Sequence, residues 1–210
     1  MPSQKVIDAA KPLFEKEGHP DGWHETIWSD VGEPGPEGAL WSFKDGVLHG
    51  SNPRGTWLVS DKEYGDFYIE FEFLLPRRGN SGFGVHFPDK GDPAFDGMEI
   101  QMCDTRYYTE TGYDFTPGEI TGCIYEAILP RVEMFRPGEW NKYQITVQGS
   151  NIWVVLNNET IIKRDLDTET RILERGKPLS ERPRRGHIGF QELCRGGDHV
   201  MIRNIKINEF

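Results

Sequence analysis

Alternation of apolar and polar side chains along short segments is the feature that most constrains how this chain folds. It is clearest in residues 66–75, DFYIEFEFLL, where the apolar side is made by Phe67, Ile69, Phe71 and Phe73. Side chains of a β-strand point alternately to its two faces, so this segment predicts a strand with one face against a core. Glu70 and Glu72 then lie on a solvated outer face, with nothing nearby to shift their pKa values.

The same pattern recurs in short segments along the rest of the chain, at 41–50, 56–60, 79–87, 96–104, 123–129, 141–148, 151–158, 186–193 and 199–210. Gly and Pro residues separate these segments, and Asp45-Gly46 is typical of a tight hairpin. Many short strands and few helices predict an all-β fold, an antiparallel β-sandwich. The alternation slips near Arg203-Asn204, which indicates a bulge in the last strand.

The remaining segments are short or irregular, and no linker divides the 210 residues, so the sequence predicts one domain over 1–210. Residues 3–13 predict a short helix capped by Ser3, in an N-terminal extension that covers 1–11. Residues 18–40 are rich in Gly and Pro and predict a loop. Residues 104–120 form a second, aromatic-rich loop of a length typical of functional lids. Residues 164–185 are charged and turn-rich.

Charge and composition exclude several classes of partner. A formal net charge of −10 argues against nucleic acid or an anionic membrane as the main partner. No apolar run approaches the roughly 18 residues that span a bilayer, and the N-terminus lacks the features of a signal peptide, which predicts a cytoplasmic protein. The three cysteines form no CxxC pair, so we expect free thiols rather than a zinc site or disulfides. The oligomeric state stays open.

Residues 79–104 contain two predicted strands, GNSGFGVHF and DGMEIQMCD, that each have one polar face. On the first strand, alternation predicts that Phe83, Val85 and Phe87 face the core, while Asn80 and His86 share the polar face with Gly82 and Gly84. On the second strand, the polar face carries Glu99, Gln101 and Cys103. Glycines leave open surface that a ligand can approach closely. We therefore predict that this polar face is the floor of a site.

The chain resembles the 3-keto-disaccharide hydrolase domain family, which has a concanavalin A-like jelly roll. The resemblance rests on an ordered set of segments that includes PLFEKEGHPDGW (12–23), DGVLHG (45–50), TWLVSDKEYGDFYIEFEF (56–73), GNSGFGVHF (79–87), DGMEIQMCD (96–104), TGCIY (121–125), PGEWNKYQI (137–145), ERPRRGHIGFQ (181–191) and IRNIKI (202–207). After GFQ the family commonly has Asp-His-Gly, whereas this chain has Glu192, Leu193 and Cys194. A role of that His would be vacant here or pass to His187 or His199.

The resemblance implies an enzyme that acts on a sugar already oxidised to a ketone at C3. A base removes the acidified C2 proton, the glycosidic oxygen leaves C1 by β-elimination, and the net outcome is that of a lyase or, after water adds back, a hydrolase. Glu99 is the leading candidate for general acid or base, and His86 is the second. The predicted substrate-binding residues are Asn80, Gln101, Tyr125, His187 and Gln191. Asp104, Asp96 and the histidines could hold a divalent metal, although no compact ligand motif exists.

Two other interpretations stay open. In EIQMCD, Glu99, Gln101 and Asp104 occupy the offsets of the Glu-x-Asp-x-x-Glu strand of retaining glucanases that resemble laminarinases, but two of the three positions are changed. The third interpretation is a carbohydrate-binding jelly roll without catalysis, since fold alone does not determine function. Its stacking platforms for sugar rings would be Tyr107, Tyr108, Tyr125 and Trp153.

Overall fold

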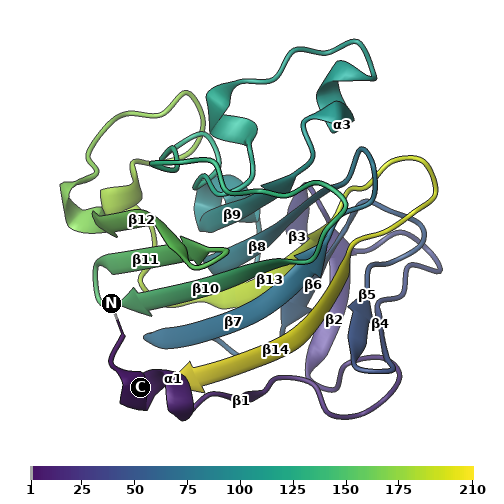
Figure 1. Ribbon diagram of the computed structural model, residues 1–210, viewed down its shortest axis with the longest axis horizontal. Helices are drawn as coiled ribbons and strands as arrows, with labels where there is room; N and C mark the ends of the chain where they lie inside the picture. The colour runs from purple at the N-terminus through teal and green to yellow at the C-terminus, as the bar shows by residue number, and fades with distance from the viewer. Residues whose placement is uncertain (1) are drawn as a thin grey trace.

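The computed structural model describes residues 2–210 and consists of two antiparallel sheets packed face to face (Figure 1). One sheet has the order β12 (Glu159–Asp165), β11 (Asn151–Leu156), β10 (Asn141–Gln148), β7 (Phe67–Leu74), β14 (Met201–Glu209), β5 (Val47–His49), β4 (Ser42–Lys44), with β1 (Lys11–Pro12) beside β14. The other has the order β3 (Asp30–Pro34), β2 (Trp23–Ile27), β6 (Thr56–Ser60), β13 (His187–Glu192), β8 (Asn80–Phe87), β9 (Met98–Cys103). The predicted all-β sandwich is confirmed.

The core lies between the two sheets and contains the apolar faces that alternation predicted. Phe71 of β7 contacts Phe83 and Phe190 of the opposite sheet, with ring centroids 5.5 and 5.3 Å apart. Each fully buried Phe side chain contributes about 1.5–3 kcal/mol through removal of its apolar surface from water. Because Ile100 and Ile188 also belong to this core, the residues that alternate with them on β9 and β13 must face outward. The core therefore sets which side of the six-stranded sheet carries a site.

A bulge at His86 breaks the alternation of β8. Val85 pairs with Ile188 and Phe87 pairs with His187, so His86 is the extra residue, and its φ is +54°. The His86 ring turns into the sandwich, where Nε2 lies 2.8 Å from the carbonyl oxygen of Gly65 and the ring meets Phe67 edge-on. Phe87 turns to the outer face instead, against Trp57. The predictions that Phe87 faces the core and that His86 lies on the polar face are therefore wrong.

Turn and bulge signals elsewhere predicted the structure well. Asp45 and Gly46 both have positive φ in the turn between β4 and β5, which confirms the hairpin. The register of β14 against β7 shifts between Arg203 and Lys206, and Asn204 has a φ of +54°, which confirms the predicted bulge. The helical and irregular segments were predicted less well. The N-terminal helix is only α1 (Gln4–Asp8), and Ser3 makes no side-chain cap.

Two predictions about segments were wrong, and one strand was missed. Residues 18–40 contain β2 and β3 rather than a loop, and β12 was not predicted at all. Residues 123–129 are not a strand, although Ile124 forms an isolated bridge with Ile100 of β9. The loops contain short helical segments: α2 (Pro93–Asp96), α3 (Arg106–Thr109), η1 (Pro117–Glu119), η2 (Leu166–Thr168) and η3 (Leu179–Glu181). Across residues 2–210, no helix has the length and apolarity needed to cross a membrane.

Glu70 also differs from its prediction as a solvated residue. Lys142 Nζ lies 2.7 Å from its carboxylate, and the Tyr68 hydroxyl donates to it over 3.0 Å. Burial acts to raise the pKa of Glu70, but the hydrogen bonds from Lys142 and Tyr68 outweigh it, so the pKa is lowered. Glu70 thus takes part in a structural ion pair on the eight-stranded sheet, on the opposite side of the sandwich from the predicted site.

Candidate functional site

A polar cavity of about 60 Å³ lies on the outer face of the six-stranded sheet. It brings together five of the residues predicted for the site: Asn80, Glu99, Gln101, Tyr125 and Gln191. The sequence analysis missed the other lining residues, which are Trp28, Asp92, Ala94, Phe95, Arg175 and Leu193. A single water needs roughly 10–15 Å³ in such a cavity, so there is room for the polar edge of one sugar ring rather than for a whole oligosaccharide.

Strand pairing explains how the polar side chains converge. β8 and β9 are antiparallel, with Gly82 opposite Gln101 and Gly84 opposite Glu99. A Cβ atom on Gly82 would lie 1.9 Å from Glu99 Oε1, and one on Gly84 would lie 2.6 Å from the Phe87 ring. The two glycines therefore make room for neighbouring side chains of the protein. The prediction that they leave open surface for a ligand is wrong at these two positions.

Glu99 is the most buried carboxyl group of the cavity, with 3% of its surface exposed. Its Oε1 atom has no hydrogen-bond partner. Burial, aided by the charges of Asp92 and Glu126, raises the pKa of Glu99 well above its usual value. Burial therefore favours the neutral carboxylic acid form of Glu99, which can donate a proton or hydrogen bond to a ligand. An unpaired buried oxygen is costly, and a ligand hydroxyl in the cavity would satisfy it.

Asp92 is a second carboxyl group in the cavity, and sequence reasoning missed it. It is the N-cap of α2 and accepts a hydrogen bond from the backbone N–H of Ala94 over 3.1 Å. Burial raises its pKa to about 6, and Arg175 Nη2 lies 3.9 Å from its carboxylate. Asp92 is thus mostly ionised at pH 7, and burial favours the protonated form more strongly at Glu99. The Asp-Pro pair at a helix start signals a cap, but it gives no sign that the carboxylate lines the same cavity as Glu99.

Neutral polar groups complete the cavity. Asn80 Oδ1 is buried without a partner, as Glu99 Oε1 is. Gln101 Oε1 accepts the backbone N–H of Met102 over 2.8 Å, so its amide nitrogen remains as the donor toward the cavity. The backbone N–H of Tyr125 donates to the carbonyl of Glu99, which holds the Tyr125 ring at the cavity although 123–129 is no strand. Such a set of neutral donors and acceptors suits the hydroxyl and carbonyl groups of a sugar.

The histidines named in the sequence analysis do not line the cavity. His86 is in the core. His187 lies on the outer face but contacts the backbone carbonyl of Ser60 and the carboxylate of Asp89, each at 2.7 Å. His199 lies 3.1 Å from His49, at the β5 side of the other sheet. The predictions that His86 shares the site and that His187 or His199 takes the place of the family's His after GFQ are not supported by this placement, because each ring is held elsewhere.

Asp104 does not line the cavity either. The Arg106 guanidinium forms an ion pair with the Asp104 carboxylate, with Arg106 Nε 2.8 Å from Asp104 Oδ1. Asp104 therefore provides no partner for Glu99, and the interpretation that these two form a glucanase-type pair is wrong. Within residues 2–210, no group of three or more His, Cys, Asp or Glu side chains is placed to hold a metal ion. The donor set thus does not fit a metal at Asp104, and we assign no catalytic step to one.

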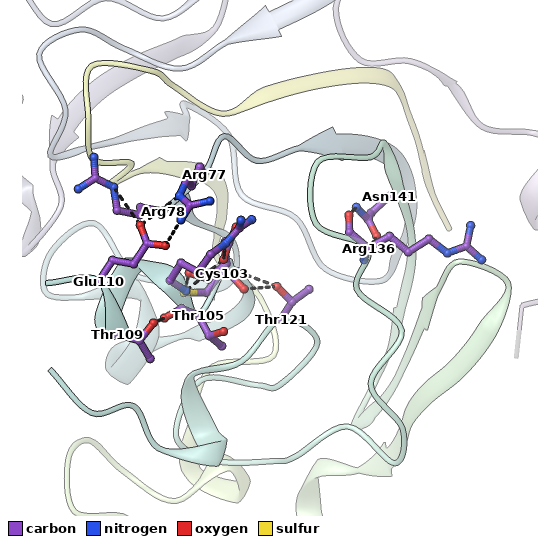
Figure 2. Close-up of polar contacts among 11 residues, drawn as sticks. Arg77, Arg78, Cys103, Thr105, Thr109, Glu110, Thr121, Arg136 and Asn141 are labelled. Atoms are coloured by element: carbon purple, nitrogen blue, oxygen red, sulfur yellow. Dashed lines mark hydrogen bonds and ion pairs between the residues drawn. The ribbon is translucent and has the colours of Figure 1, made fainter. Parts of the chain in front are cut away.

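The cavity opens into a larger cleft of about 540 Å³. Four residues line both spaces: Trp28, Asn80, Tyr125 and Leu193. The rest of the cleft is formed by Arg54, Tyr107, Tyr108, Tyr113, Asp114, Glu119 and Arg195. Loop 104–120, predicted as a lid, thus supplies one wall. Figure 2 shows how this loop is held, with Glu110 of the loop paired to Arg77 and Arg78 and with Thr121, just after the loop, bonded to the backbone of Cys103.

The sandwich and its polar cavity define a carbohydrate-active domain of the jelly-roll class. More narrowly, the chain belongs to the 3-keto-alpha-glucoside-1,2-lyase-like domain family, whose model matches residues 9–208. This confirms the resemblance seen in the sequence. No curated protein sequence matches the chain.

Several solved structures are similar to the chain. One, from Parabacteroides distasonis ATCC 8503 and described as a candidate glycosyl hydrolase, is 28% identical with a TM-score of 0.76, and the match covers 96% of this chain and 99% of that one. A second from the same organism, with the same description, is 24% identical with a TM-score of 0.76, covering 100% and 98%. A Bacillus subtilis protein with a galectin-like fold is 12% identical, covers 89% of each chain and has a TM-score of 0.53, which reflects the fold alone.

Proposed function

We propose that the protein cleaves 3-keto-glycosides by elimination across C1 and C2 of the oxidised sugar. The family assignment points to this substrate class. The observation that carries the proposal is the pair of carboxyl groups that line one cavity, in unlike surroundings: Glu99 is buried, which raises its pKa well above the usual value, whereas Asp92 has a pKa of about 6 and lies near Arg175. Two titratable groups whose environments separate their pKa values are the usual arrangement for acid and base roles.

In the proposed reaction Asp92 is the base and Glu99 is the acid. The C3 ketone acidifies the proton on C2, and the Asp92 carboxylate takes that proton. The C2–H electron pair becomes the C1=C2 double bond, the C1–O bond breaks, and the leaving oxygen receives the proton of Glu99. After the reaction Asp92 is protonated and Glu99 is ionised. A proton must then pass from Asp92 to Glu99 before the next cycle. A base with a pKa near the working pH is suited to this step.

The amide side chains would bind and orient the sugar. Charge develops on the C3 oxygen while the C2 proton is removed, and a donor fixed beside that oxygen lowers the barrier. The free amide nitrogens of Gln101 and Asn80 are suited to this role. The unpaired Asn80 Oδ1 would accept a sugar hydroxyl. Addition of water to the eliminated product would give net hydrolysis.

A carbohydrate-binding domain without catalysis is the second candidate, and the cleft favours it. Trp28 and Tyr113 are exposed and offer ring faces beside the cavity, as sugar-binding surfaces often do. Of the residues suggested for stacking, only Trp153 lies elsewhere, on β11 of the other sheet. Tight binding of both plain and 3-keto glycosides without turnover of either would support this candidate.

The test is an incubation of the protein with a 3-keto-glucoside and with the matched unoxidised glucoside, followed by mass spectrometry. We expect cleavage of the 3-keto substrate alone, with a sugar product lighter by one water than the hydrolysis product. Cleavage of the plain glucoside would instead favour retaining hydrolysis by the same two carboxyls. A parallel incubation with EDTA tests for the divalent metal considered in the sequence analysis.

Two isosteric variants test the assigned roles. Glu99→Gln removes the acidic proton, and Asp92→Asn removes the base but keeps a residue that caps helices well. Each should lower kcat for a 3-keto-glucoside by about 10²–10⁴-fold, the usual contribution of a general acid or base. The matched control is Glu63→Gln, because Glu63 pairs with Arg185 at the surface away from the cavity. Wild-type turnover by both variants would overturn the assignment.

A further inference from the structure

Two arginines at the cleft, Arg54 and Arg195, have no carboxylate within 4.0 Å among residues 2–210, although Arg54 is near enough to Glu192 to affect its pKa. Most arginines lie within 4.0 Å of a carboxylate, namely Arg77, Arg78, Arg106, Arg131, Arg164, Arg175, Arg184, Arg185 and Arg203. Arg54 and Arg195 form no such ion pair among the described residues, yet both line the cleft. In a chain of net charge −10, two unpaired guanidinium groups in one cleft need a reason.

Both guanidinium groups are held in place around Tyr107. Arg54 donates from Nε to the carbonyl of Leu193 over 3.0 Å and from Nη2 to the Tyr107 hydroxyl over 3.2 Å. The Arg195 guanidinium carbon lies 4.4 Å from the centre of the Tyr107 ring, and its Nε is buried without an acceptor. Tyr107 itself is buried on α3. Arg54 Nη1 and the Arg195 guanidinium thus retain donors for a ligand, fixed before it binds.

The two carboxylates that line the cleft, Glu119 and Asp114, form no ion pair with Arg54 or Arg195. Glu119 uses both carboxylate oxygens within the protein, accepting the backbone N–H of Thr116 at one and the Tyr125 hydroxyl at the other. Asp114 lies on the exposed part of loop 104–120, and no ion pair joins it to Arg54 or Arg195. The arginine wall therefore keeps its positive charge, and an anion there would gain charge-assisted hydrogen bonds without displacing a carboxylate.

We propose that the cleft binds the leaving group of the substrate and that this leaving group is a ring bearing a carboxylate. The inference rests on the proposed function, because the cavity then holds the oxidised sugar and the adjoining cleft receives whatever is attached to C1. A cleft of about 540 Å³ has the size of an ordinary small-ligand site. Trp28 and Tyr113, which are 43% and 65% exposed, offer ring faces for stacking, and the arginines bind the carboxylate.

Such a ring could be a uronic acid or an aromatic acid, and matched substrates separate the two. The first pair is a 3-keto-glucosyl glucuronate and its uronamide. The second pair is 4-carboxyphenyl 3-keto-glucoside and its carboxamide. Each pair differs only in charge. We expect kcat/KM to favour the acid by about tenfold in at least one pair, the value of one charge-assisted hydrogen bond in a solvent-open site. Added salt should reduce this preference.

Variants test which residues cause the preference for the acid over the amide. Arg54→Gln and Arg195→Gln should each bring the acid-to-amide ratio close to one, whereas Arg164→Gln should keep the wild-type ratio because Arg164 pairs with Glu169 on the other sheet. Equal kcat/KM for acid and amide in both pairs would overturn the carboxylate subsite while cleavage itself stood. If no 3-keto substrate were cleaved, the proposed function would fail separately. Calorimetric binding of the unoxidised acid and amide would then decide, with equal affinities overturning the subsite.

Discussion

Replacement of Gly82 by alanine is a sensitive probe of the site, because it adds one methyl group beneath the carboxyl group of Glu99. The new Cβ would lie 1.9 Å from Glu99 Oε1 and 2.6 Å from its Cδ and Cγ atoms. Ordinary contacts of this kind exceed about 3 Å, so the carboxyl group must move by roughly 1 Å. A displacement of that size can lower turnover by about 10²-fold.

Stability should change less than activity. Overpacking of this kind costs about 1–3 kcal/mol, and the lower entropy of the unfolded chain offsets about 0.4–1 kcal/mol of it. A domain stable by about 5–15 kcal/mol remains folded after such a loss. Gly65→Ala is the matched control, since its Cβ would make only a normal contact, 3.4 Å from Arg185 Nη1.

The assay is kcat/KM for a 3-keto-glucoside in a double-mutant cycle with Glu99→Gln. If Gly82→Ala acts by displacing Glu99, it should cost about 10²-fold in the wild type and little more in the Glu99→Gln background. Additive losses would show that Gly82 acts through another group. Wild-type activity in Gly82→Ala, with the protein folded by circular dichroism, would refute the assignment of Glu99.

Three further predictions follow from the buried titratable groups. Since Asp92 must be ionised and Glu99 protonated, kcat/KM should rise with pH through about 6 and fall at higher pH, and Asp92→Asn should abolish the acid limb. Burial raises the pKa of Glu192 in the folded protein to about 7, above its value in the unfolded chain. The contribution of Glu192 to the free energy of unfolding is therefore fully present below the unfolded pKa and is lost as the pH rises through about 7. In urea titrations, the free energy of unfolding of Glu192→Gln should change with pH by about 3 kcal/mol less than that of the wild type. An unchanged pH dependence would contradict the reasoning. His86→Ala should lower unfolding free energy by about 1–3 kcal/mol but leave kcat/KM unchanged, and a selective loss of kcat would return His86 to the site.

Alternation was enough to predict the sandwich and the floor of the cavity. Phe71 and Ile100 had to face a core, and this placed Glu99 and Gln101 on the opposite side of the same sheet. Alternation gave the wrong face for His86 and Phe87. His86 adopts a positive φ that lets it stand as an extra residue against β13, and the period-two rule reverses beyond such a bulge. No local signal in GVHF marks that reversal.

Asp92 and Arg175 were missed for a different reason. Both lie in segments without a periodic pattern, and they meet only because distant segments fold over the sheet. Arg182, from the charged and turn-rich segment 164–185, is buried and donates to the carbonyls of Ala94 and Gly97, which fixes α2 beside the cavity. Contacts of this kind depend on tertiary placement. They cannot be predicted from spacing along one segment, so the sequence identified the floor of the site but not its walls.

β9 is the last strand of its sheet, and its outer edge is covered by residues 121–125. The carbonyl of Glu99 accepts from Tyr125, both backbone groups of Gln101 bond to residues 122 and 123, and those of Cys103 bond to the Thr121 hydroxyl. An uncovered edge strand is a template on which a second chain can add and aggregate. Here the segment that positions Tyr125 also closes that edge. The amides of Gln101 and Cys103 should therefore exchange with deuterium as slowly as those of an interior strand, and loosening of residues 121–125 would expose the protein to self-association at the strand that carries Glu99.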